Sequence, residues 1–533
     1  MRKFDKGNLL FLVVLLLYVV YAAIYIYKTS FVVSGQRYFV LFDDAMISMR
    51  YARNFAQGYG LVWNPGGAQV EGYTNPLWVV FMSFFHLFPI PASKISLFIQ
   101  VSGGIFIIAS LVYIKKIARL LSGSWVVALL AVTLTAFYTP LNNWALQGME
   151  VSVLVVILIA ALWLVLANLK SGGFSPWPYL LLGVGTLVRI DMAVPYIIIL
   201  AFLALADPGH RRGHLAWGLG VLAFFLLGQT LFRLWYYGDI LPNTYYLKVA
   251  GYPFQLRITH GLYVLFRFIL GMNWALFLFP FLSLAFRRDR SIVLLFLVLL
   301  GQLAYSVYVG GDAWEHKGGS NRYIALAMPV FFILFADTAW LLLNAVIERL
   351  TAQPSRASLA LGSLGMVLFV LASMVNMNYL VNIRSLERWA LLRQPDFIEG
   401  NKEYVQISLA LEKITRPDAS IAVVSAGAIP YFTDLHAIDL LGKNDPVIAH
   451  EKAHLRSGPF NLENFRPGHM KWDYDYSIGQ LKPDAVVQLW GDTETAEAYI
   501  KQYYVVGGAE GDLSFSLRKG SENILWDKVV LVP

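Results

Sequence analysis

The chain has 533 residues, of which 57% are hydrophobic and only 14% are charged, and its mean hydropathy is +0.57. A soluble domain carries about a quarter charged residues, so this composition indicates an integral membrane protein. The net charge of +8 is modest and fits membrane topology, so no nucleic-acid partner is expected. The lack of cysteine excludes disulfides, thiolate metal sites and a cysteine nucleophile.

Apolar runs of about 20 residues without alternation predict membrane-spanning helices rather than a barrel. Residues 9–28 follow a basic N-terminal segment, as in a signal peptide, but no small-x-small cleavage site follows them closely. We therefore expect a retained first span with its N-terminus in the cytoplasm. About eleven spans are expected: 9–28, 95–114, 122–140, 149–168, 177–190, 192–206, 214–237, 258–286, 291–309, 322–347 and 357–380. Residues 77–91 are also apolar; either they form a re-entrant or interfacial helix, or two of the short spans are miscounted.

Basic residues cluster in alternate loops, at residues 115–119, 170, 211–212, 287–290 and 349–356. The positive-inside rule places these loops in the cytoplasm. The other loops are then expected on the outer face: 29–94, 141–148, 189–191, 238–257, 310–321 and everything after about 381. The sequence therefore predicts a multi-pass protein of the inner (plasma) membrane, with the lipid bilayer as a partner.

From about residue 384, short β-branched segments alternate with amphipathic helical ones. This pattern predicts an extracytoplasmic α/β domain over 384–533, which follows a helical transmembrane domain over 1–383. We expect the α/β domain to rest over the outer face, where "GAIPYF" (residues 427–432) either helps to hold an acceptor or belongs to a folding lid.

The first outer loop, residues 29–94, is unusually polar. "DDAMISMRYARNFAQ" predicts a helix with Asp43 and Asp44 in its first turn, where the helix dipole favours ionised carboxylates. Helical spacing puts Arg50 and Asn54 on the face of Asp43, and Tyr51 on the adjacent face. One carboxylate can then pair with Arg50 while the other acts as a general base. The alternative is that both aspartates only cap the helix.

The rest of this loop has the side chains of a sugar site. "NPGG" (residues 64–67) predicts a tight turn, and "EGYTNPLW" (residues 71–78) returns to the membrane. Its polar and aromatic groups suit hydrogen bonding and stacking on a sugar. We take Glu71, Tyr73 and Asn75 as candidate substrate-binding residues, together with four residues of the helix: Arg50, Tyr51, Arg53 and Asn54.

"DDAMISMRYARNFAQGYGLVWNPGGAQVEGYTNPLW" (residues 43–78) resembles the first outer loop of a bacterial family of GT-C glycosyltransferases, to which the mycobacterial terminal arabinofuranosyltransferases are broadly related. The resemblance continues through "LQGMEVSV", "LVRIDM", "YGDILPNTYYLK", "VGGDAWEHKGGSNRYIALAMP" and "SAGAIPYFTDLHAIDLLGKND", and so covers most of the chain. It does not identify the sugar.

The resemblance implies an enzyme that moves a sugar from a polyprenyl-phosphate donor to a hydroxyl of an envelope glycan or glycolipid. An acidic residue of the first outer loop is then the base of an inverting transfer. Asp44 is slightly favoured, with Asp43 orienting it or binding a metal. The lipid phosphate is a good leaving group, so no protein nucleophile is needed. A divalent cation such as Mg²⁺ or Mn²⁺ is a candidate cofactor, and its ligands are unknown.

The leaving phosphate needs cations near the membrane surface. The candidates are Lys248, Arg189 and Arg322, and Asn243 belongs to the same motif as Lys248. Lys248 and Arg322 could alternatively snorkel at helix ends. Arg189 and Asp191 interrupt an apolar run, which marks them as functional candidates or as a structural ion pair.

Two further acidic positions face outward. Asp312, Glu315 and His316 share one loop whose spacing matches no zinc motif, so a second acidic site that orients donor or acceptor is expected. Glu150 in "GME" is a weaker candidate of the same kind. His210 and His214 lie in a basic loop and are expected to have no special role.

Three other functions fit parts of the sequence. A transporter or flippase would show repeated halves and mid-membrane charges, which we do not find. A non-catalytic envelope assembly protein explains the C-terminal domain but not the polar first loop. The same fold could also transfer another polyprenyl-linked group.

Overall fold

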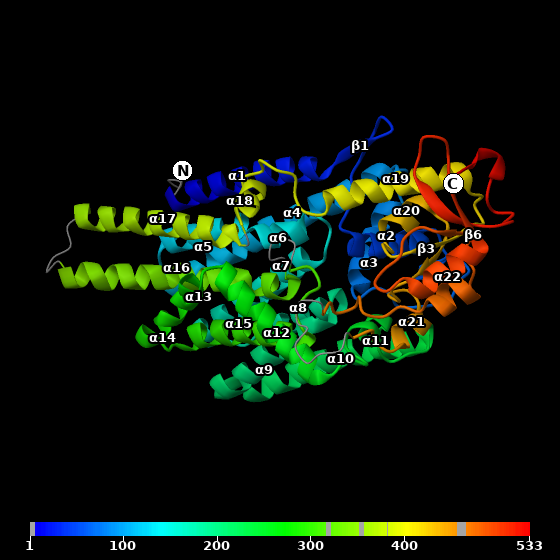
Figure 1. Ribbon diagram of the computed structural model, residues 1–533. Coiled ribbons are helices and arrows are strands. Elements are labelled where there is room, and N and C mark those ends of the chain that lie inside the picture. The colour runs from blue at the N-terminus through cyan, green and yellow to red at the C-terminus, as the bar shows by residue number, and fades with distance from the viewer. Residues whose placement is uncertain (1–5, 316–320, 351–355, 381, 456–464, 533) are drawn as a thin grey trace.

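A computed structural model describes residues 6–315, 321–350, 356–380, 382–455 and 465–532. The molecule is an elongated helical bundle that carries a mixed α/β unit at one end (Figure 1). The helices before the C-terminal sheet are α1 (Lys6–Thr29), α2 (Asp43–Ala56), α3 (Pro76–His86), α4 (Ala92–Ser122), α5 (Trp125–Ala136), α6 (Thr139–Ala145), α7 (Val151–Ser171), α8 (Trp177–Val188), α9 (Ala193–Ala206), α10 (Arg211–Tyr237), α11 (Asn243–Lys248), α12 (Phe254–Gly271), α13 (Trp274–Leu278), α14 (Ser283–Phe286), α15 (Arg290–Val309), α16 (Arg322–Leu350), α17 (Arg356–Tyr379), α18 (Ile383–Trp389) and α19 (Ile398–Ile414).

Most of these helices are apolar enough to lie in a membrane. Among the described residues, seven are long enough to cross it alone, and up to nine spans result if the bent pairs α5 with α6 (58°) and α12 with α13–α14 (102°) each count as one. The eleven predicted segments are all largely helical, but α8 and α9 have only 12 and 14 residues. A crossing needs about 20 residues, so the count of eleven stays a prediction. Helix α3 has 11 residues and is too short to cross, as its interpretation as an interfacial or re-entrant helix requires.

The surface of α10 shows why the bundle needs lipid. Its exposed side chains include Phe224 and Trp235, which are 73% and 78% exposed, together with Leu227 and Leu231. A continuous apolar face of this kind is unfavourable in water and favourable against acyl chains. The helical part of the chain is therefore a membrane domain.

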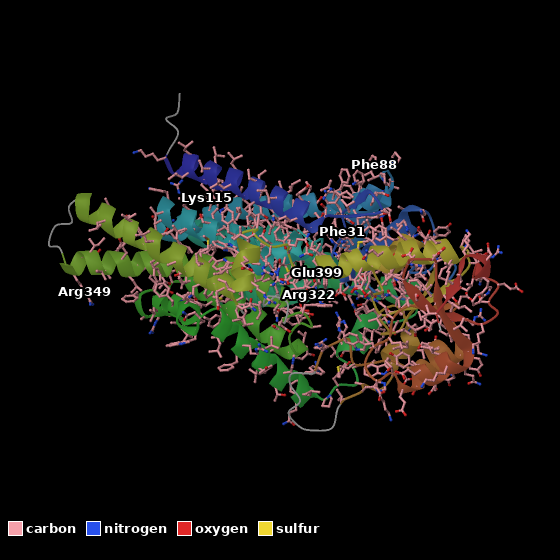
Figure 2. All side chains as sticks on the ribbon, turned by 45° about the horizontal axis from the view of Figure 1, so that its top comes forward. Phe31, Phe88, Lys115, Arg322, Arg349 and Glu399 are labelled. Atoms are coloured by element: carbon pink, nitrogen blue, oxygen red, sulfur yellow. The ribbon has the colours of Figure 1, made fainter. Side chains whose placement is uncertain are left out.

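The two predicted sets of loops lie at opposite ends of the bundle. Lys115 and Arg349 lie toward the end away from the C-terminal unit, whereas Arg322 lies nearer that unit (Figure 2). At the far end, Lys115 Nζ donates to Asn8 Oδ1 (2.7 Å), and Arg287 pairs with Asp337 (3.0 Å). Described residues of the loops assigned to the outer face, from 189–191, 238–257 and 310–315, line one cavity at the other end together with Thr74 and Pro467.

The C-terminal unit contains a six-stranded mixed sheet in the order β4-β3-β5-β7-β6-β8. Strand β3 runs parallel to β4 and β5, with Ser420 opposite His436 and Ile421 opposite Ala485, and the other pairs are antiparallel. Its elements are β3 (Ser420–Val423), α20 (Ala428–Thr433), β4 (His436–Asp439), α21 (Pro446–His450), β5 (Ala485–Val486), α22 (Glu494–Tyr503), β6 (Tyr504–Gly508), β7 (Ser514–Arg518) and β8 (Val530–Leu531). The predicted α/β character is confirmed.

Two short β features were not predicted from the sequence. Strand β7 reads "SFSLR", and only its alternate residues Phe515 and Leu517 are buried. A small hairpin, β1 (Phe31–Val33) and β2 (Gln36–Tyr38), follows the first helix. Its turn is Ser34–Gly35, with φ values of 48° and 77°, and positive φ at both positions suits a tight two-residue hairpin.

The hydrophobic core is continuous from the bundle into the C-terminal unit. The ring of Phe42, just before α2, packs edge-on against Trp144 (5.4 Å between centroids) and Phe397 (4.6 Å). Asn401 Nδ2 on α19 donates to the carbonyl of Leu41 (3.0 Å). Helix α2 is thus enclosed between the membrane domain and the C-terminal unit, and its first turn lies where they meet.

Candidate active site

Helix α2 begins at Asp43, and its first turn holds both aspartates, as predicted. The N-cap residue is Phe42, which makes no side-chain capping hydrogen bond. The carboxylates instead have partners far away in the sequence. Asp43 Oδ1 accepts a hydrogen bond from the backbone N–H of Ala428 (2.8 Å), at the start of α20. Burial raises the pKa of Asp43 to about 6, although this N–H and the Lys443 ammonium both oppose the shift.

Asp44 is surrounded by cations. The Lys443 ammonium donates to Oδ1, and Arg322 Nη2 lies 3.5 Å from Oδ2. Burial alone would raise the pKa of Asp44, but Lys443, Arg322 and Lys248 together hold it well below its usual range. Asp44 is therefore ionised at neutral pH.

A cavity of about 130 Å³ is joined to Asp44 through Arg322, and neither Asp43 nor Asp44 is among its lining residues. Its charged lining residues are Arg189, Asp191, Lys248, Asp312 and Arg322. The loops after α8, α10 and α15 contribute to it, and Pro467 of the C-terminal unit lines one side. The three cations that the sequence suggested for phosphate binding thus converge on one cavity, and Arg322 connects that cavity to Asp44.

Two polar groups in this cavity have no protein partner within the described residues. The Lys248 ammonium makes no hydrogen bond or ion pair there, and Asp191 Oδ1 is buried without a hydrogen bond. Burial lowers the pKa of Lys248 to about 7, and the nearby Arg322 guanidinium acts in the same direction. A buried polar group without a partner is unfavourable, so this cavity is suited to a ligand that supplies both an anion and a hydroxyl donor.

A buried network supports the cavity from behind. Arg189 pairs with Glu150 (2.9 Å) and Asp191 (3.0 Å), so the predicted ion pair is present and also lines the cavity. Asn75 Nδ2 donates to Glu150 Oε2 (3.0 Å), and Asn75 Oδ1 accepts from Ser48 Oγ of α2 (2.9 Å). Glu150 and Asn75 therefore link the first helix of the site to Arg189.

Asp312 and Arg322 form a bidentate pair at the start of α16. Arg322 Nε and Nη2 lie 2.7 Å and 3.0 Å from the two Asp312 oxygens. Glu315 accepts from Asn321 Nδ2 (3.0 Å) in the same loop, and burial raises its pKa well above the usual range. Arg322 is buried, and the half-buried Lys248 lines the same cavity, so neither snorkels at a helix end. His316, the remaining candidate here, lies outside the described residues.

Arg50 does not pair with either aspartate, so that prediction is wrong. Its guanidinium donates to the carbonyls of Trp63 (2.5 Å), Pro430 (2.5 Å) and Leu435 (2.8 Å) and to Asn64 Oδ1 (2.8 Å). Helical spacing correctly predicted that Arg50 lies on the same face of α2 as Asp43, but the C-terminal unit covers the Arg50 part of that face. Arg50 therefore joins α2 to the C-terminal unit.

The other polar residues of α2 also make structural contacts. Tyr51 Oη donates to the Val70 carbonyl (2.7 Å), and Asn54 Nδ2 donates to the carbonyls of Val62 and Trp63 (2.9 and 3.0 Å). Arg53 donates to the Tyr431 carbonyl (2.7 Å) and pairs with Asp434, whose side chain is 59% exposed. These contacts fix the turn around Gly66–Gly67 and hold the C-terminal unit in place.

The remaining candidates bind protein groups near the site. Glu71 pairs with Arg233 of α10 (2.7 Å), and Tyr73 Oη hydrogen-bonds to Tyr237 Oη (2.7 Å). Asn243 Nδ2 donates to the carbonyls of Gly442 and Lys443 (both 2.9 Å).

Lys443 and the Ala428 N–H were missed because both come from the C-terminal unit. One signal existed in the sequence: "DLLGKND" directly follows β4, a parallel strand, and ligands commonly bind at the carboxyl ends of parallel strands. The sequence did not indicate which outer loop would contact this edge of the sheet.

The donor set near Asp44 does not favour a divalent cation. No group of three His, Cys, Asp or Glu side chains is placed to hold a metal among the residues that the structure describes. Both oxygens of Asp44 already face cations, which would repel Mg²⁺ or Mn²⁺. We therefore derive no step through a metal ion.

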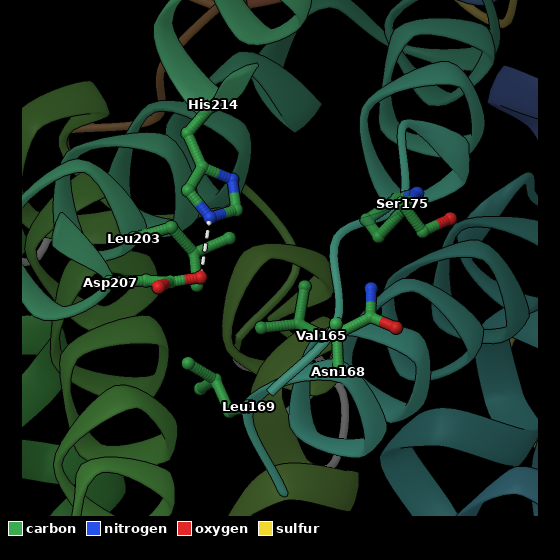
Figure 3. Close-up of a pocket in the computed structure, with 9 residues that line it drawn as sticks. Val165, Asn168, Leu169, Ser175, Leu203, Asp207 and His214 are labelled. Carbon is green, nitrogen blue, oxygen red and sulfur yellow. Dashed lines mark hydrogen bonds and ion pairs between the residues drawn. The ribbon is translucent and has the colours of Figure 1, made fainter. Parts of the chain in front are cut away.

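A second polar cluster lies at the far end of the bundle. His214 Nε2 contacts Asp207 Oδ2 (3.1 Å) beside a small pocket lined by apolar side chains such as Val165 and Leu203 (Figure 3), and Tyr179 Oη contacts His214 Nδ1 (2.8 Å). These contacts tie α8 and the end of α9 to α10.

The bundle with its polar end, enclosed by an α/β unit, is the fold of the GT-C membrane glycosyltransferases. Two kinds of solved structure show this likeness. ArnT from Cupriavidus metallidurans bound to undecaprenyl phosphate matches with a TM-score of 0.52 and 13% identity, over 80% of this chain and 85% of ArnT. The apo oligosaccharyltransferase of Archaeoglobus fulgidus matches with a TM-score of 0.56 and 11% identity, over 100% of this chain and 76% of that enzyme.

Sequence comparisons add little to the fold. A family model described as a domain of unknown function, DUF8728, matches residues 392–521, which fall in the C-terminal unit. No curated protein matches the chain.

Proposed function

We propose that the protein is a membrane glycosyltransferase that moves a sugar from a polyprenyl-phosphate donor to a hydroxyl of an extracytoplasmic glycan or glycolipid, with inversion at the anomeric carbon. The observation that carries the proposal is the unpaired Lys248 ammonium in a cavity with Arg189 and Arg322, of which Arg322 also pairs with Asp44. The donor would meet the acceptor at the outer face of the plasma membrane.

A lipid-linked sugar phosphate has the groups that the cavity lacks. Its phosphate is an anion for Lys248 and Arg322, and a sugar hydroxyl can donate to the unpaired Asp191 Oδ1. Its polyprenyl chain can lie along the apolar surface of the bundle. ArnT, which shares the fold, was solved with undecaprenyl phosphate bound, and this supports a lipid phosphate as part of the donor.

The geometry favours Asp43 as the base, whereas the sequence slightly favoured Asp44. Asp44 is paired with two cations, and its lowered pKa makes it a weak proton acceptor. Asp43 has no ion pair among the described residues, and its pKa of about 6 is better matched to accepting a proton near neutrality.

In the transfer step, an acceptor oxygen attacks the anomeric carbon and gives its proton to Asp43. The bond between that carbon and the phosphate oxygen breaks, and the phosphate leaves with the electron pair. Lys248, Arg189 and Arg322 stabilise its charge. No covalent intermediate with the protein is required. Residues 43–78 resemble a bacterial GT-C family to which the mycobacterial terminal arabinofuranosyltransferases are broadly related, and this supports a cell-envelope glycan as the acceptor.

The test is a comparison of lipid extracts from cells that carry the wild type, Asp43→Asn, Asp44→Asn or the double variant in place of the natural gene. The donor should accumulate in Asp43→Asn cells, and mass spectrometry of the accumulated lipid would identify its sugar. With that lipid as substrate, purified Asp43→Asn should be slower by about 10²–10⁴-fold, the usual contribution of a positioned base. Wild-type activity should fall as the pH drops through about 6, where Asp43 takes up a proton. Near-wild-type transfer by both single variants and the double variant would contradict the proposal.

A further inference from the structure

Lys443 lies in the loop between β4 and α21, and this loop is held rigidly within the C-terminal unit. Asn444 donates to Asp439 Oδ2 through both its backbone N–H and its Nδ2, each at 2.9 Å. Asn243 of α11 donates to the carbonyls of Gly442 and Lys443. Each of these groups is buried, so the path of the loop is fixed on both sides of Lys443.

The membrane domain holds the same loop from the opposite side. Tyr51 Oη of α2, which donates to the Val70 carbonyl, also lies 3.1 Å from Asn444 Oδ1. Gly72 packs so closely that a Cβ there would lie 2.0 Å from Asn444 Oδ1 and 2.8 Å from the Lys443 carbonyl. Contacts from α2, α11 and the first outer loop therefore converge on a single lysine of the C-terminal unit.

This loop delivers the Lys443 ammonium to Asp44 Oδ1. The pair is nearly closed off from water, with side-chain exposures of 11% for Lys443 and 13% for Asp44. The other charged or titratable groups that face Asp44 are Arg322 from α16, Lys248 from α11, the adjacent Asp43, and His469 from the C-terminal unit.

Burial makes the position of Asp44 unfavourable for an anion, and Lys443 offsets this more than Arg322 or Lys248 does. Asp44 shares Arg322 with the phosphate cavity, so an unneutralised Asp44 would repel an incoming phosphate and compete for the same guanidinium. We propose that Lys443 is a positioning residue of the donor site: it neutralises and fixes Asp44, so that Arg322 and Lys248 remain available to the donor's phosphate. This inference rests on the proposed function, and it makes the C-terminal unit part of the donor site.

The test measures the binding of undecaprenyl phosphate to the purified full-length protein, and so does not depend on catalysis. Lys443→Gln should weaken binding by at least about tenfold, because it leaves an uncompensated carboxylate beside the site. Asp44→Asn in the same chain should restore binding to within about threefold of the wild type, because the repelling charge is then gone. Lys443→Arg should bind nearly as well as the wild type. Lys452→Gln, an exposed lysine of the same unit, is the matched control and should change nothing.

The outcomes separate the two proposals. Failure of the wild type to bind undecaprenyl phosphate would overturn the proposed donor class, and this role of Lys443 with it. Normal binding by Lys443→Gln would overturn the role of Lys443 and leave the proposed function standing. Weak binding by Lys443→Gln that Asp44→Asn does not restore would show that Lys443 only maintains the fold of its loop, and would also overturn the inference.

Discussion

Arg322 Nη2 lies 3.5 Å from Asp44 Oδ2, although the two residues are 278 positions apart in the chain. The same guanidinium binds both oxygens of Asp312 and lines the cavity. The start of α16 and the start of α2 are thereby joined through one cation. A phosphate that enters the cavity meets a guanidinium already oriented by Asp312, which reduces the reorganisation that binding requires.

Lys248 should make phosphate binding depend on pH. Its pKa of about 7 means that it is protonated below pH 7 and increasingly neutral above it. A bound phosphate favours the protonated form, so the affinity for undecaprenyl phosphate should fall by up to about tenfold for each pH unit above 7. Titrations between pH 6 and 9 would measure this. Lys248→Arg stays charged and should bind with little pH dependence in the same range. A wild-type affinity that is constant from pH 7 to 9 would contradict the role of Lys248.

Gly427 is required by the close approach of the C-terminal unit to α2. A Cβ at this position would lie 2.0 Å from the Asp43 carbonyl oxygen and 2.8 Å from its Oδ1. Gly427→Ala should therefore displace α20 and destabilise the protein by about 1–3 kcal/mol, with loss of transfer activity. Thermal unfolding and limited proteolysis would detect the change. Gly228→Ala in α10 is the control, since no heavy atom lies within 4 Å of its Cβ. Equal stability of the two variants would show that the contact is not tight in solution.

Arg50 should matter for stability and not for substrate affinity. Arg50→Ala removes the donors of four hydrogen bonds, three of them buried, so we expect a loss of about 3–5 kcal/mol. Arg50→Lys should rescue little of it, because an ammonium cannot reproduce the planar fork. The comparison is Arg53→Ala, whose ionic partner Asp434 is exposed and should contribute less than about 1 kcal/mol. An Arg50→Ala protein that keeps its melting temperature but has a raised KM would support a substrate-binding role instead.

The proposed topology can be tested with single cysteines, because the natural chain has none. Arg212 and Glu494 are exposed, at the start of α10 and at the start of α22. In spheroplasts, a membrane-impermeant maleimide should label Glu494→Cys, and should label Arg212→Cys only after the membrane is permeabilised. The reverse pattern would place the site and the C-terminal unit in the cytoplasm, where an extracytoplasmic acceptor could not be reached.

The sequence by itself determined the features that depend on local pattern. Apolar composition gave the membrane class, basic residues sorted the loops into two sets that lie at opposite ends, and helical spacing placed Asp43 and Asp44 in the first turn of α2. The sequence predicted the cavity cations Arg189, Lys248 and Arg322 because a charged side chain within or beside an apolar run is unfavourable unless it has a partner or a ligand. Strand β7 was missed because only two of its side chains face the core.

Only the tertiary structure decided the roles of the polar residues. Arg50 has the same spacing from Asp43 whether it pairs with a carboxylate or binds the carbonyls of α20, and the C-terminal unit decides in favour of the carbonyls. Lys443 and Asp44 are separated by 399 positions, and no periodicity reports a contact over that distance. Side-chain pattern reflects which face of an element is buried, whereas the partner that buries it depends on how the whole chain packs.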